Sequence, residues 1–324
     1  MSGLSDSFQR PINYLRISVT DRCNFRCVYC TPPQERVLLS RDEVLTYEEI
    51  HAVVKAAASL GISKVRLTGG EPLIRANITH LIQLLSSVDG INDISLTTNG
   101  VLLKQHAADL RQAGLHRVNI SLDTLNRRKF EKITGFDRLE DVLAGIEAAH
   151  DAGLTPVKIN MVVMGNVNED EVINFALLTK EQGWHVRFIE LMPFIQDGIR
   201  FVSAQHIQQQ IASLGNPEPT PSPVGNGPAK YYRLPGAQGT IGFINPVSEH
   251  FCFGCNRMRL TADGKLLPCL LSPTEVDLRP TLRQDASPQA LIATIKRAVE
   301  AKPKEHMLGE SVDYFPRQMT YMGG

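Results

Sequence analysis

The sequence has little that would suit a membrane or a nucleic acid. No stretch among its 324 residues approaches the roughly 18 consecutive apolar residues that a membrane span needs. Residues 1–11 are polar and lack the apolar core of a secretory signal. Lys plus Arg and Asp plus Glu each number 34, so no net charge favours nucleic acid or an anionic membrane. We therefore expect a cytoplasmic protein with no nucleic-acid partner and no membrane attachment.

Two further absences narrow the range of protein classes that the sequence allows. The sequence contains no Walker A motif, which argues against nucleotide hydrolysis on a P-loop. It also shows no internal repeat beyond the spacing of its predicted strands and helices. Hydrophobic residues make up 43% of the chain and charged residues 21%, as in ordinary globular proteins. The length allows one large domain or two smaller ones.

The first 192 residues alternate between short strand-like and longer helix-like segments. Strands are predicted at 14–20, 64–68, 93–98, 116–123, 157–164 and 185–191, and helices at 46–60, 77–88, 102–113, 139–152 and 169–182. Thr46 and Asn77 stand where N-cap residues are expected. Four of the helices are followed by a glycine suited to a left-handed C-cap, namely Gly61, Gly114, Gly153 and Gly183. Six such units in a row predict a parallel sheet.

The strands alternate between apolar and polar residues. Leu15, Ile17 and Val19 are apolar, whereas Arg16 and Ser18 are polar. Strands of a doubly wound sheet are apolar on both faces, so this alternation favours a curled sheet with a polar interior. A complete eight-stranded barrel fills its interior with apolar side chains. The pattern therefore predicts an α/β protein with an incomplete (β/α)6 TIM-like barrel, open enough to hold a large ligand.

The last third of the chain has a different character. It predicts a helix at 203–214, a proline-rich linker or mobile loop at 215–229, strands and turns at 230–271, and a helix at 287–301. We expect this extension to close the open side of the barrel. The expected division is a barrel domain over residues 1–200 and a C-terminal extension over residues 201–324.

The six cysteines form two triads. Cys23, Cys27 and Cys30 directly follow the first predicted strand, where a short loop could present three thiolates to an iron–sulfur cluster. A structural zinc site would normally need a second pair of ligands nearby, which this segment lacks. The second triad is Cys252, Cys255 and Cys269. Its spacing leaves a cluster and a Cys3His zinc site with His250 equally open.

Basic residues gather on the polar side of the predicted strands. They are Arg16, Lys64, Arg66, Arg117, Lys158 and Arg187. Burying several unpaired cations on one wall is costly, and a polyphosphate ligand would remove that cost. For Arg117, an ordinary salt bridge within the protein is the alternative to a contact with this ligand. The pattern therefore indicates a polyanion in the barrel.

The sequence from Cys23 to Cys30 resembles the radical S-adenosylmethionine (SAM) enzymes. Within them it is similar to the GTP 3′,8-cyclases of molybdenum cofactor biosynthesis. The similar stretches are 15–23, 66–73, 96–100, 118–123, 187–190, 229–232, 255–260 and the terminal Gly323 and Gly324. They span nearly the whole chain. The sequence departs from the family at Thr31, at 75–77 and at Met322, none of which is a predicted cluster ligand.

The resemblance implies a role for each matching residue. Cys23, Cys27 and Cys30 would hold one 4Fe–4S cluster, and Cys252, Cys255 and Cys269 a second. SAM would lie against Tyr29, Gly70, Glu71, Ser121 and Met192. We attribute to the glycines a close approach to this ligand, and to Glu71 acceptance of a hydrogen bond from its ammonium. GTP would contact Arg16, Lys64, Arg66, Thr97, Lys158, Arg187, Arg257, Met258 and Arg259, with Met258 as a packing residue or backbone contact. Arg257, Arg259, Gly323 and Gly324 would also serve catalysis.

The implied reaction is a radical cyclisation. An adenosyl radical would remove hydrogen from C3′ of the GTP ribose, and the new radical would attack C8 of guanine. The product would pass to a cyclic pyranopterin monophosphate synthase, and a reduced electron donor would be required. Two alternatives are another radical SAM enzyme with an auxiliary cluster, such as a peptide modifier, and a non-enzymatic metal sensor. The sequence leaves the oligomeric state open, a homodimer included.

Overall fold

Six strands from the first two thirds of the chain lie side by side and run parallel in chain order. They are β1 (Tyr14–Ser18), β2 (Lys64–Thr68), β3 (Asp93–Thr98), β4 (Arg117–Ser121), β5 (Lys158–Val163) and β6 (His185–Glu190). The structure is a computed structural model and describes residues 3–30, 38–194, 198–284, 287–306 and 319–323. All six strands were predicted, with ends that differ by at most two residues.

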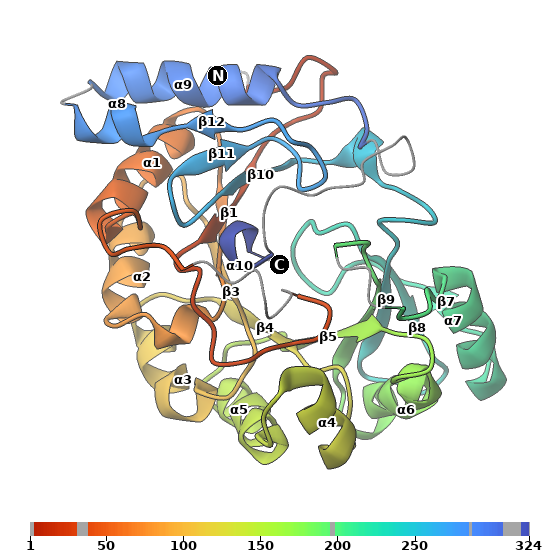
Figure 1. Cartoon of the computed structure of the whole chain (residues 1–324). Coiled ribbons are helices and arrows are strands. Elements are labelled where there is room, and N and C mark those ends of the chain that lie inside the picture. The colour runs from red at the N-terminus through yellow and green to blue at the C-terminus, as the bar shows by residue number, and fades with distance from the viewer. Residues whose placement is uncertain (1–2, 31–37, 195–197, 285–286, 307–318, 324) are drawn as a thin grey trace.

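Helices follow these strands and cover the outer side of the sheet (Figure 1). They are α1 (Tyr47–Ser59), α2 (Ile78–Ser86), α3 (Leu103–Gln112), α4 (Arg127–Thr134), α5 (Leu139–Asp151) and α6 (Val172–Glu181), with short 3₁₀ turns at Pro72–Ile74 and Glu169–Glu171. Five of the six were predicted. The sequence analysis missed α4, because its eight residues are mostly charged and only Phe130, Ile133 and Thr134 are buried.

The ends of the predicted helices show where local signals hold. Thr46 caps α1 with a full capping box, in which its hydroxyl accepts from the Glu49 amide and the Glu49 carboxylate accepts from the Thr46 amide. Asn77 precedes α2, but its backbone is left-handed and its side chain makes no capping bond. The prediction of a side-chain cap at Asn77 is therefore wrong. The four predicted C-cap glycines all have positive φ.

The C-terminal part adds a parallel strand to each edge of the six. β10 (Arg257–Leu260) pairs with β1, and β9 (Thr240–Ile244) pairs with β6. Antiparallel strands follow on both sides: β11 (Lys265–Leu267) and β12 (Val276–Asp277) beyond β10, and β8 (Lys230–Arg233) and β7 (Glu218–Pro219) beyond β9. The expected incomplete barrel with a C-terminal extension is confirmed, and the extension continues the barrel's own sheet.

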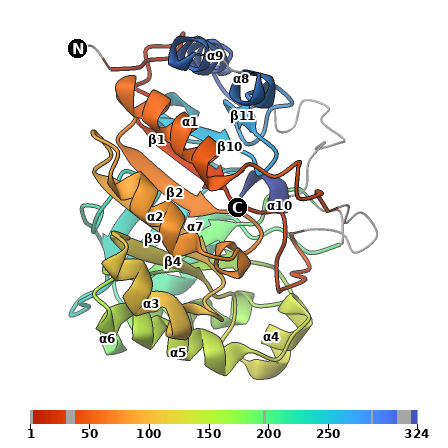
Figure 2. The same ribbon diagram turned by 90° about the vertical axis from the view of Figure 1, so that its left-hand side faces the viewer.

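The remaining helices pack around this extended sheet. They are α7 (Ala204–Ile211), α8 (Arg279–Arg283), α9 (Pro288–Glu300) and α10 (Met319–Met322), with 3₁₀ turns at Ala212–Leu214 and Cys252–Gly254. α9 lies along the outside next to α1 (Figure 2). α10 instead lies inside the curl of the sheet, in the middle of Figure 1, beside β1. No helix in the described parts of the chain combines the length and the apolar composition of a membrane span.

The predicted alternation of the strands sets the two faces of the sheet. Leu15 and Ile17 of β1 are 1% and 0% exposed and pack in the hydrophobic core under the outer helices. Complete burial of such a side chain contributes about 1.5–3 kcal/mol. Arg16, between them, lines the interior cavity with polar residues of neighbouring strands. The fold thus places its polar strand residues around one interior space.

Candidate active site

The first cysteine triad lies on the loop after β1, which α4 holds in place. The amide of Arg26 donates to the Thr134 carbonyl (2.8 Å), and the amide of Val28 donates to the Ile133 carbonyl (3.0 Å). Phe25, 4% exposed, meets Phe130 edge-to-face with ring centroids 5.6 Å apart. The missed helix is therefore the support of the cysteine loop.

The thiols of this triad suit a shared metal centre. The amide of Cys30 donates to the Cys27 carbonyl (3.0 Å), and the amide of Phe25 donates to Cys23 Sγ (3.4 Å). Burial, with the nearby Cys30 and Asp123, raises the pKa of the Cys27 thiol well above its usual range. Three thiolates grouped there need a compensating cation, which an iron–sulfur cluster supplies. The donor set therefore fits a cluster with one open iron.

Gly70 allows the turn after β2 to meet the cysteine loop. Its amide donates to the Thr20 carbonyl (2.8 Å), and the Glu71 amide donates to the Arg22 carbonyl (2.8 Å). A Cβ at Gly70 would lie 2.1 Å from the Arg22 carbonyl oxygen, so no other residue fits without displacing that backbone. This contact fixes the chain just before Cys23. The close approach predicted for this glycine is thus an approach to the protein's own backbone.

Glu71 uses its carboxylate inside the protein. The side chain is 1% exposed, and its oxygens accept from the Leu73 amide (3.0 Å), the Thr98 hydroxyl (2.7 Å) and the Asn99 amide (2.7 Å). Burial raises its pKa to about 7 against the lowering effect of these bonds. The carboxylate thus holds the turn after β2, and its further role as an acceptor for a ligand's ammonium stays a prediction.

Tyr29 points its hydroxyl toward Asp123 at the end of β4. The hydroxyl donates to Asp123 Oδ2 (2.7 Å), and the Val162 amide donates to Oδ1 (2.8 Å). Ser121, the other predicted SAM contact on this strand, ends β4 and is half-buried. Asp123 thus links the cysteine loop to β5 through Tyr29 and Val162, and it was not among the predicted site residues.

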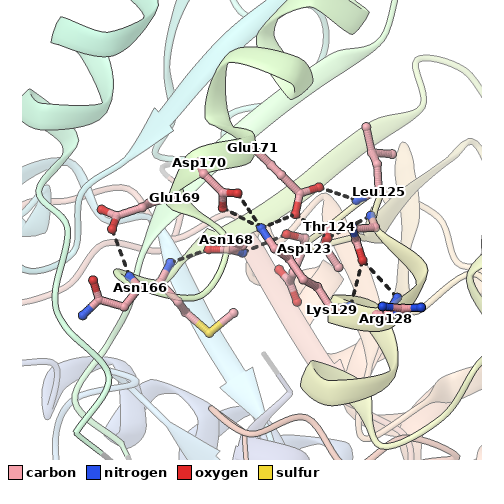
Figure 3. A network of polar contacts seen from close by, with 12 residues as sticks. Asp123, Thr124, Leu125, Arg128, Lys129, Asn166, Asn168, Glu169, Asp170 and Glu171 are labelled. Atoms are coloured by element: carbon pink, nitrogen blue, oxygen red, sulfur yellow. Dashed lines mark hydrogen bonds and ion pairs between the residues drawn. The ribbon is translucent and has the colours of Figure 1, made fainter.

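A polar network behind Asp123 keeps this end of the barrel in place (Figure 3). The side-chain Nδ2 of Asn168 donates to the Asp123 carbonyl (2.8 Å) and the Val162 carbonyl (2.9 Å). Lys129 of α4 pairs with Asp170 (2.6 Å) and Glu171 (3.2 Å). The helix that supports the cysteine loop is thereby tied to the segment that supports Asp123.

The interior of the barrel holds an open cavity of about 1380 Å³, a volume that includes solvent at its mouth. Seven basic side chains and one acid, Asp93, are among the described residues that line it. The basic ones are Arg16, Arg66, Arg117, Lys158, Arg187, Arg257 and Arg259. Thr97 and Met192 also line it, whereas Lys64 and Ser121 are not among the lining residues. The predicted cation wall is thus brought together except for Lys64.

The wall carries more positive charge than the protein neutralises. Arg117 pairs with Asp93 (2.5 Å), which is the salt bridge left open for it. Arg187, 5% exposed, donates to the Asn119 side-chain oxygen (2.7 Å). Burial, reinforced by Arg187 and then Arg117, lowers the pKa of Lys158 to about 6. A polyanionic ligand would relieve this crowding of like charges.

Two polar atoms in the cavity are ready for a ligand. The Thr97 hydroxyl and the Asn160 side-chain oxygen are buried, and neither has a hydrogen-bond partner among the described residues. Buried polar atoms of this kind are usually satisfied. Their orphaned state supports the position of Thr97 in the ligand site.

The proline-rich segment contributes to the cavity. Val224, Gly225, Asn226, Gly227 and Pro228 all line it, and the Lys158 ammonium donates to the Val224 carbonyl. The sequence analysis treated 215–229 as a linker or mobile loop. Its composition gave no sign that the segment folds over the strands' inner face.

The second triad opens onto the same cavity. Cys252, Cys255 and Cys269 all line it. Burial raises the pKa of Cys255, but the charges of Arg257 and Lys302 outweigh burial and lower it to about 7. The donor atoms of His250, Cys252 and His306 lie within 4.8 Å of one another, so histidine donors stand beside this triad. The thiols suit a cluster, and the histidines keep the zinc alternative chemically reasonable.

The C-terminal segment reaches the inner wall. Arg259 donates to the Gly323 carbonyl, and the Gly323 amide donates to the Met319 carbonyl (2.9 Å). Gly323 has φ +72°, and an added Cβ would lie 2.2 Å from Thr68 Cγ2, so this position requires glycine. Gly324 lies outside the described residues.

Met258 does not face the ligand space. It sits between Arg257 and Arg259 on β10, is 1% exposed and belongs to the hydrophobic core. Because alternate strand residues face opposite sides, its side chain packs under the outer helices. The structure therefore bears out the packing role considered for Met258, and a backbone contact with GTP stays a prediction.

Several lining residues were missed. Tyr14 lies two residues before Arg16 on the same face of β1, and the Arg66 guanidinium lies 5.6 Å from its ring centroid. The strand alternation could have found Tyr14. His306, which also lines the cavity, and Lys302, which contacts Cys255 behind it, follow α9, and no local pattern distinguishes them from ordinary surface residues.

The class of protein follows from the fold and the first triad. Residues 17–179 match the family model of the radical SAM superfamily, and residues 184–308 match that of Molybdenum Cofactor Synthesis C. The superfamily implies S-adenosylmethionine and a 4Fe–4S cluster, for which the first triad offers three thiols.

Solved structures share the fold. Streptococcus suis SuiB bound to S-adenosylmethionine has a TM-score of 0.64 at 14% identity, covering 97% of this chain and 76% of that one. Native anSMEcpe with bound AdoMet has a TM-score of 0.61 at 18% identity, covering 93% and 86%.

Curated relatives give the narrower family. The GTP 3′,8-cyclase of Heliobacterium modesticaldum is 50% identical over 98% of this chain and 99% of its own length. The GTP 3′,8-cyclase of Pelotomaculum thermopropionicum is 50% identical over 99% and 100%. That of Moorella thermoacetica is 48% identical over 99% and 100%. The chain belongs to the radical SAM superfamily and, within it, to the family of the GTP 3′,8-cyclases.

Proposed function

We propose that this chain converts GTP to (8S)-3′,8-cyclo-7,8-dihydroguanosine 5′-triphosphate, the first step of molybdenum cofactor biosynthesis. The observation that carries the proposal is the single cavity lined by seven basic side chains and by the second cysteine triad. Near-complete similarity to GTP 3′,8-cyclases supports it. In functional terms, residues 1–200 hold the radical-generating centre, and residues 201–324 supply the second triad and the tail.

The cation wall would bind the triphosphate. Arg16 and Arg66 project into the cavity from the neighbouring strands β1 and β2, and Lys158 and Arg187 from the neighbouring strands β5 and β6. Guanidinium groups suit phosphate because they donate two parallel hydrogen bonds. Arg117 would contribute less, since its charge is already paired with Asp93. Lys64, on the same face of β2 as Arg66 but outside the cavity lining, would act at longer range or not at all.

The first triad would hold the 4Fe–4S cluster that binds SAM. With SAM bound, this centre supplies the carbon-centred radical that removes hydrogen from the ribose. The loop on Gly70 and α4 would fix the centre's position, while Tyr29, Ser121 and Met192 would lie along the cofactor. Of these, Met192 lines the same cavity as the cation wall, which supports a passage from the first centre to the nucleotide.

The second triad would hold a second 4Fe–4S cluster whose open iron meets the guanine base. Its thiols line the nucleotide cavity, and Arg257 and Arg259 flank them on β10. Arg259 links this wall to the Gly323 carbonyl, so the tail would help to order the base or the phosphates. Zinc at Cys252 with His250 and His306 is the alternative occupant.

A cavity enclosed by strands on its inner side suits radical chemistry. Holding both reacting carbons in one ligand conformation supplies proximity, and the surrounding strands keep bulk water from the intermediate. A reduced electron donor would supply an electron to the first cluster. The product would pass to a cyclic pyranopterin monophosphate synthase. A homodimer would be compatible with this scheme.

The test is an anaerobic incubation with SAM, dithionite and GTP. We expect 5′-deoxyadenosine and a cyclised nucleotide to form together, and both to fall to background when GTP is left out. Arg187→Met should raise the GTP concentration needed, whereas the exposed Arg41→Met should not. A peptide-modifying enzyme would show no dependence on GTP. Absence of any SAM cleavage would exclude an enzyme of this class.

A further inference from the structure

A buried lysine lies behind the second triad. Lys302, 3% exposed, follows α9 and directs its ammonium at three acceptors. These are the Pro268 carbonyl (2.6 Å), the Arg257 carbonyl (2.8 Å) and Cys255 Sγ (3.5 Å). A lysine ammonium has three hydrogens, so the geometry uses its full donor capacity.

The three acceptors belong to the triad's own supports. Pro268 directly precedes Cys269, and Arg257 is two residues after Cys255. One ammonium therefore joins the backbone beside two of the three thiols and contacts one sulfur. Among the described residues, no carboxylate forms an ion pair with Lys302. A buried ammonium without a carboxylate is costly, and a negatively charged metal–thiolate centre would balance it.

A second cation fixes the same segment from the other end of the chain. Arg10, paired with Asp6 at 2.6 Å, donates to the Cys252 carbonyl (2.6 Å). It also donates to the carbonyls of Pro303 (2.6 Å) and Lys304 (2.7 Å). The residues just after Lys302 are thereby tied to the third thiol's backbone. The hydrogen bonds of Arg10 thus help to hold Lys302 against the second triad.

We propose that Lys302 is a positioning residue for the metal centre of the second triad. It holds the loops of Cys255 and Cys269 together, and its charge stabilises the reduced, more negative form of that centre, which raises its reduction potential. The proposal deepens the proposed function and rests on it. Lys302 lies outside the cysteine motifs. It would hold the loops of the second triad in place, as backbone hydrogen bonds and aromatic packing hold the loop of the first triad.

The experiment uses the full chain reconstituted anaerobically with iron and sulfide. Lys302→Met removes the charge at similar length, and the exposed Lys304→Met, two residues on, is the matched control. Potentiometric titration followed by electron paramagnetic resonance reports each cluster, and the N-terminal cluster serves as the internal reference. In Lys302→Met we expect a more negative potential for the second cluster alone. We also expect loss of its iron to a chelator roughly 10–100-fold faster.

Each possible outcome either supports or overturns the proposed role of Lys302. An unchanged potential and unchanged iron loss in Lys302→Met would overturn the proposal. If that variant assembles no second cluster, Lys302→Arg decides: recovery of the cluster supports the proposal, and failure to recover it overturns it. The proposed function fails separately, through absence of GTP-dependent SAM cleavage in the unmodified chain.

Discussion

Cys27 of the first cysteine triad and Cys255 of the second lie in opposite electrostatic surroundings, whereas burial raises the pKa of Cys252 as it does that of Cys27. Around the first, burial and the negative neighbours Cys30 and Asp123 raise the pKa of Cys27. Around the second, Arg257 and Lys302 overcome burial and lower the pKa of Cys255 to about 7. Each triad offers three thiols, so the difference comes from what the fold packs behind them.

The difference fits a division of labour. Nearby negative charge disfavours adding an electron to a cluster, so the first centre, once reduced, would be the stronger reductant that SAM cleavage needs. Nearby positive charge favours the reduced state and attracts anions, so the second centre would suit binding of a nucleotide. The comparison predicts that damage to one triad changes chemistry at that triad and spares the other.

The largest expected effect separates the two triads directly. Cys27→Ser should reduce SAM cleavage to background, because the radical-generating cluster loses a ligand. Cys255→Ser should leave some 5′-deoxyadenosine formation and abolish the cyclised nucleotide, because only placement of the base is lost. Chromatography of both products from anaerobic reactions measures this. Equal loss of both products in the two variants would show that the triads form one functional unit.

A smaller effect is expected at the link between the second triad's wall and the tail. Arg259→Ala removes the donor to the Gly323 carbonyl and one cavity cation. Loss of a charged hydrogen bond costs about 1.5–3 kcal/mol, so turnover should fall roughly 10–100-fold. Iron and sulfide content should match those of the unmodified chain and of the exposed Arg41→Ala. Loss of iron from Arg259→Ala alone would make Arg259 a structural support of the cluster.

On the side of the first triad, Glu71 gives a milder test. Glu71→Gln keeps the size of the side chain but places an amide against donors that now serve a carboxylate. The turn that positions Cys23 should loosen, and the first cluster should lose iron to a chelator about tenfold faster. The second cluster should be unaffected. Equal release from both sites would contradict the separate support of the two triads.

The smallest expected effect is a pH dependence of nucleotide binding. Burial, followed by Arg187, Arg117 and Arg66, lowers the pKa of Lys158 to about 6 in the free protein. A bound triphosphate would raise that pKa, so binding takes up a proton above pH 6 and affinity falls as pH rises. The limit is about tenfold per pH unit for one proton.

Calorimetry in buffers of different ionisation enthalpy would count that proton. Lys158→Arg keeps its charge throughout this range and provides the reference, since the phosphate's own titration is common to both proteins. An identical pH profile in Lys158→Arg would show that Lys158 does not titrate on binding.

Much of this site could be predicted because strand alternation is a local signal. Arg16, Arg66 and Arg187 face the cavity for the reason the sequence indicates, namely that alternate residues of a strand share a face. The same rule places the side chain of Met258 in the core. The cluster site of Cys23, Cys27 and Cys30 could be predicted because the spacing of the three cysteines alone indicates it.

The parts that could not be predicted depend on long-range packing. β9 and β10 join the sheet at edges far from their neighbours in sequence, and short strands with glycine or charge carry no sign of their partners. α4 is too short and too charged to show a clear apolar periodicity. Lys302 is buried only because Arg10 and the cysteine loops close around it.

The most direct measurement concerns the second centre and the nucleotide. A variant with Cys23, Cys27 and Cys30 replaced by Ser isolates the second triad, and its reduced cluster can be followed by electron paramagnetic resonance. We expect GTP to change the spectrum and SAM to leave it unchanged, since in the proposed function only the nucleotide would lie against Cys252, Cys255 and Cys269. A spectrum unaffected by GTP, or a site that holds zinc and no iron, would contradict a nucleotide held between the cation wall and a second cluster.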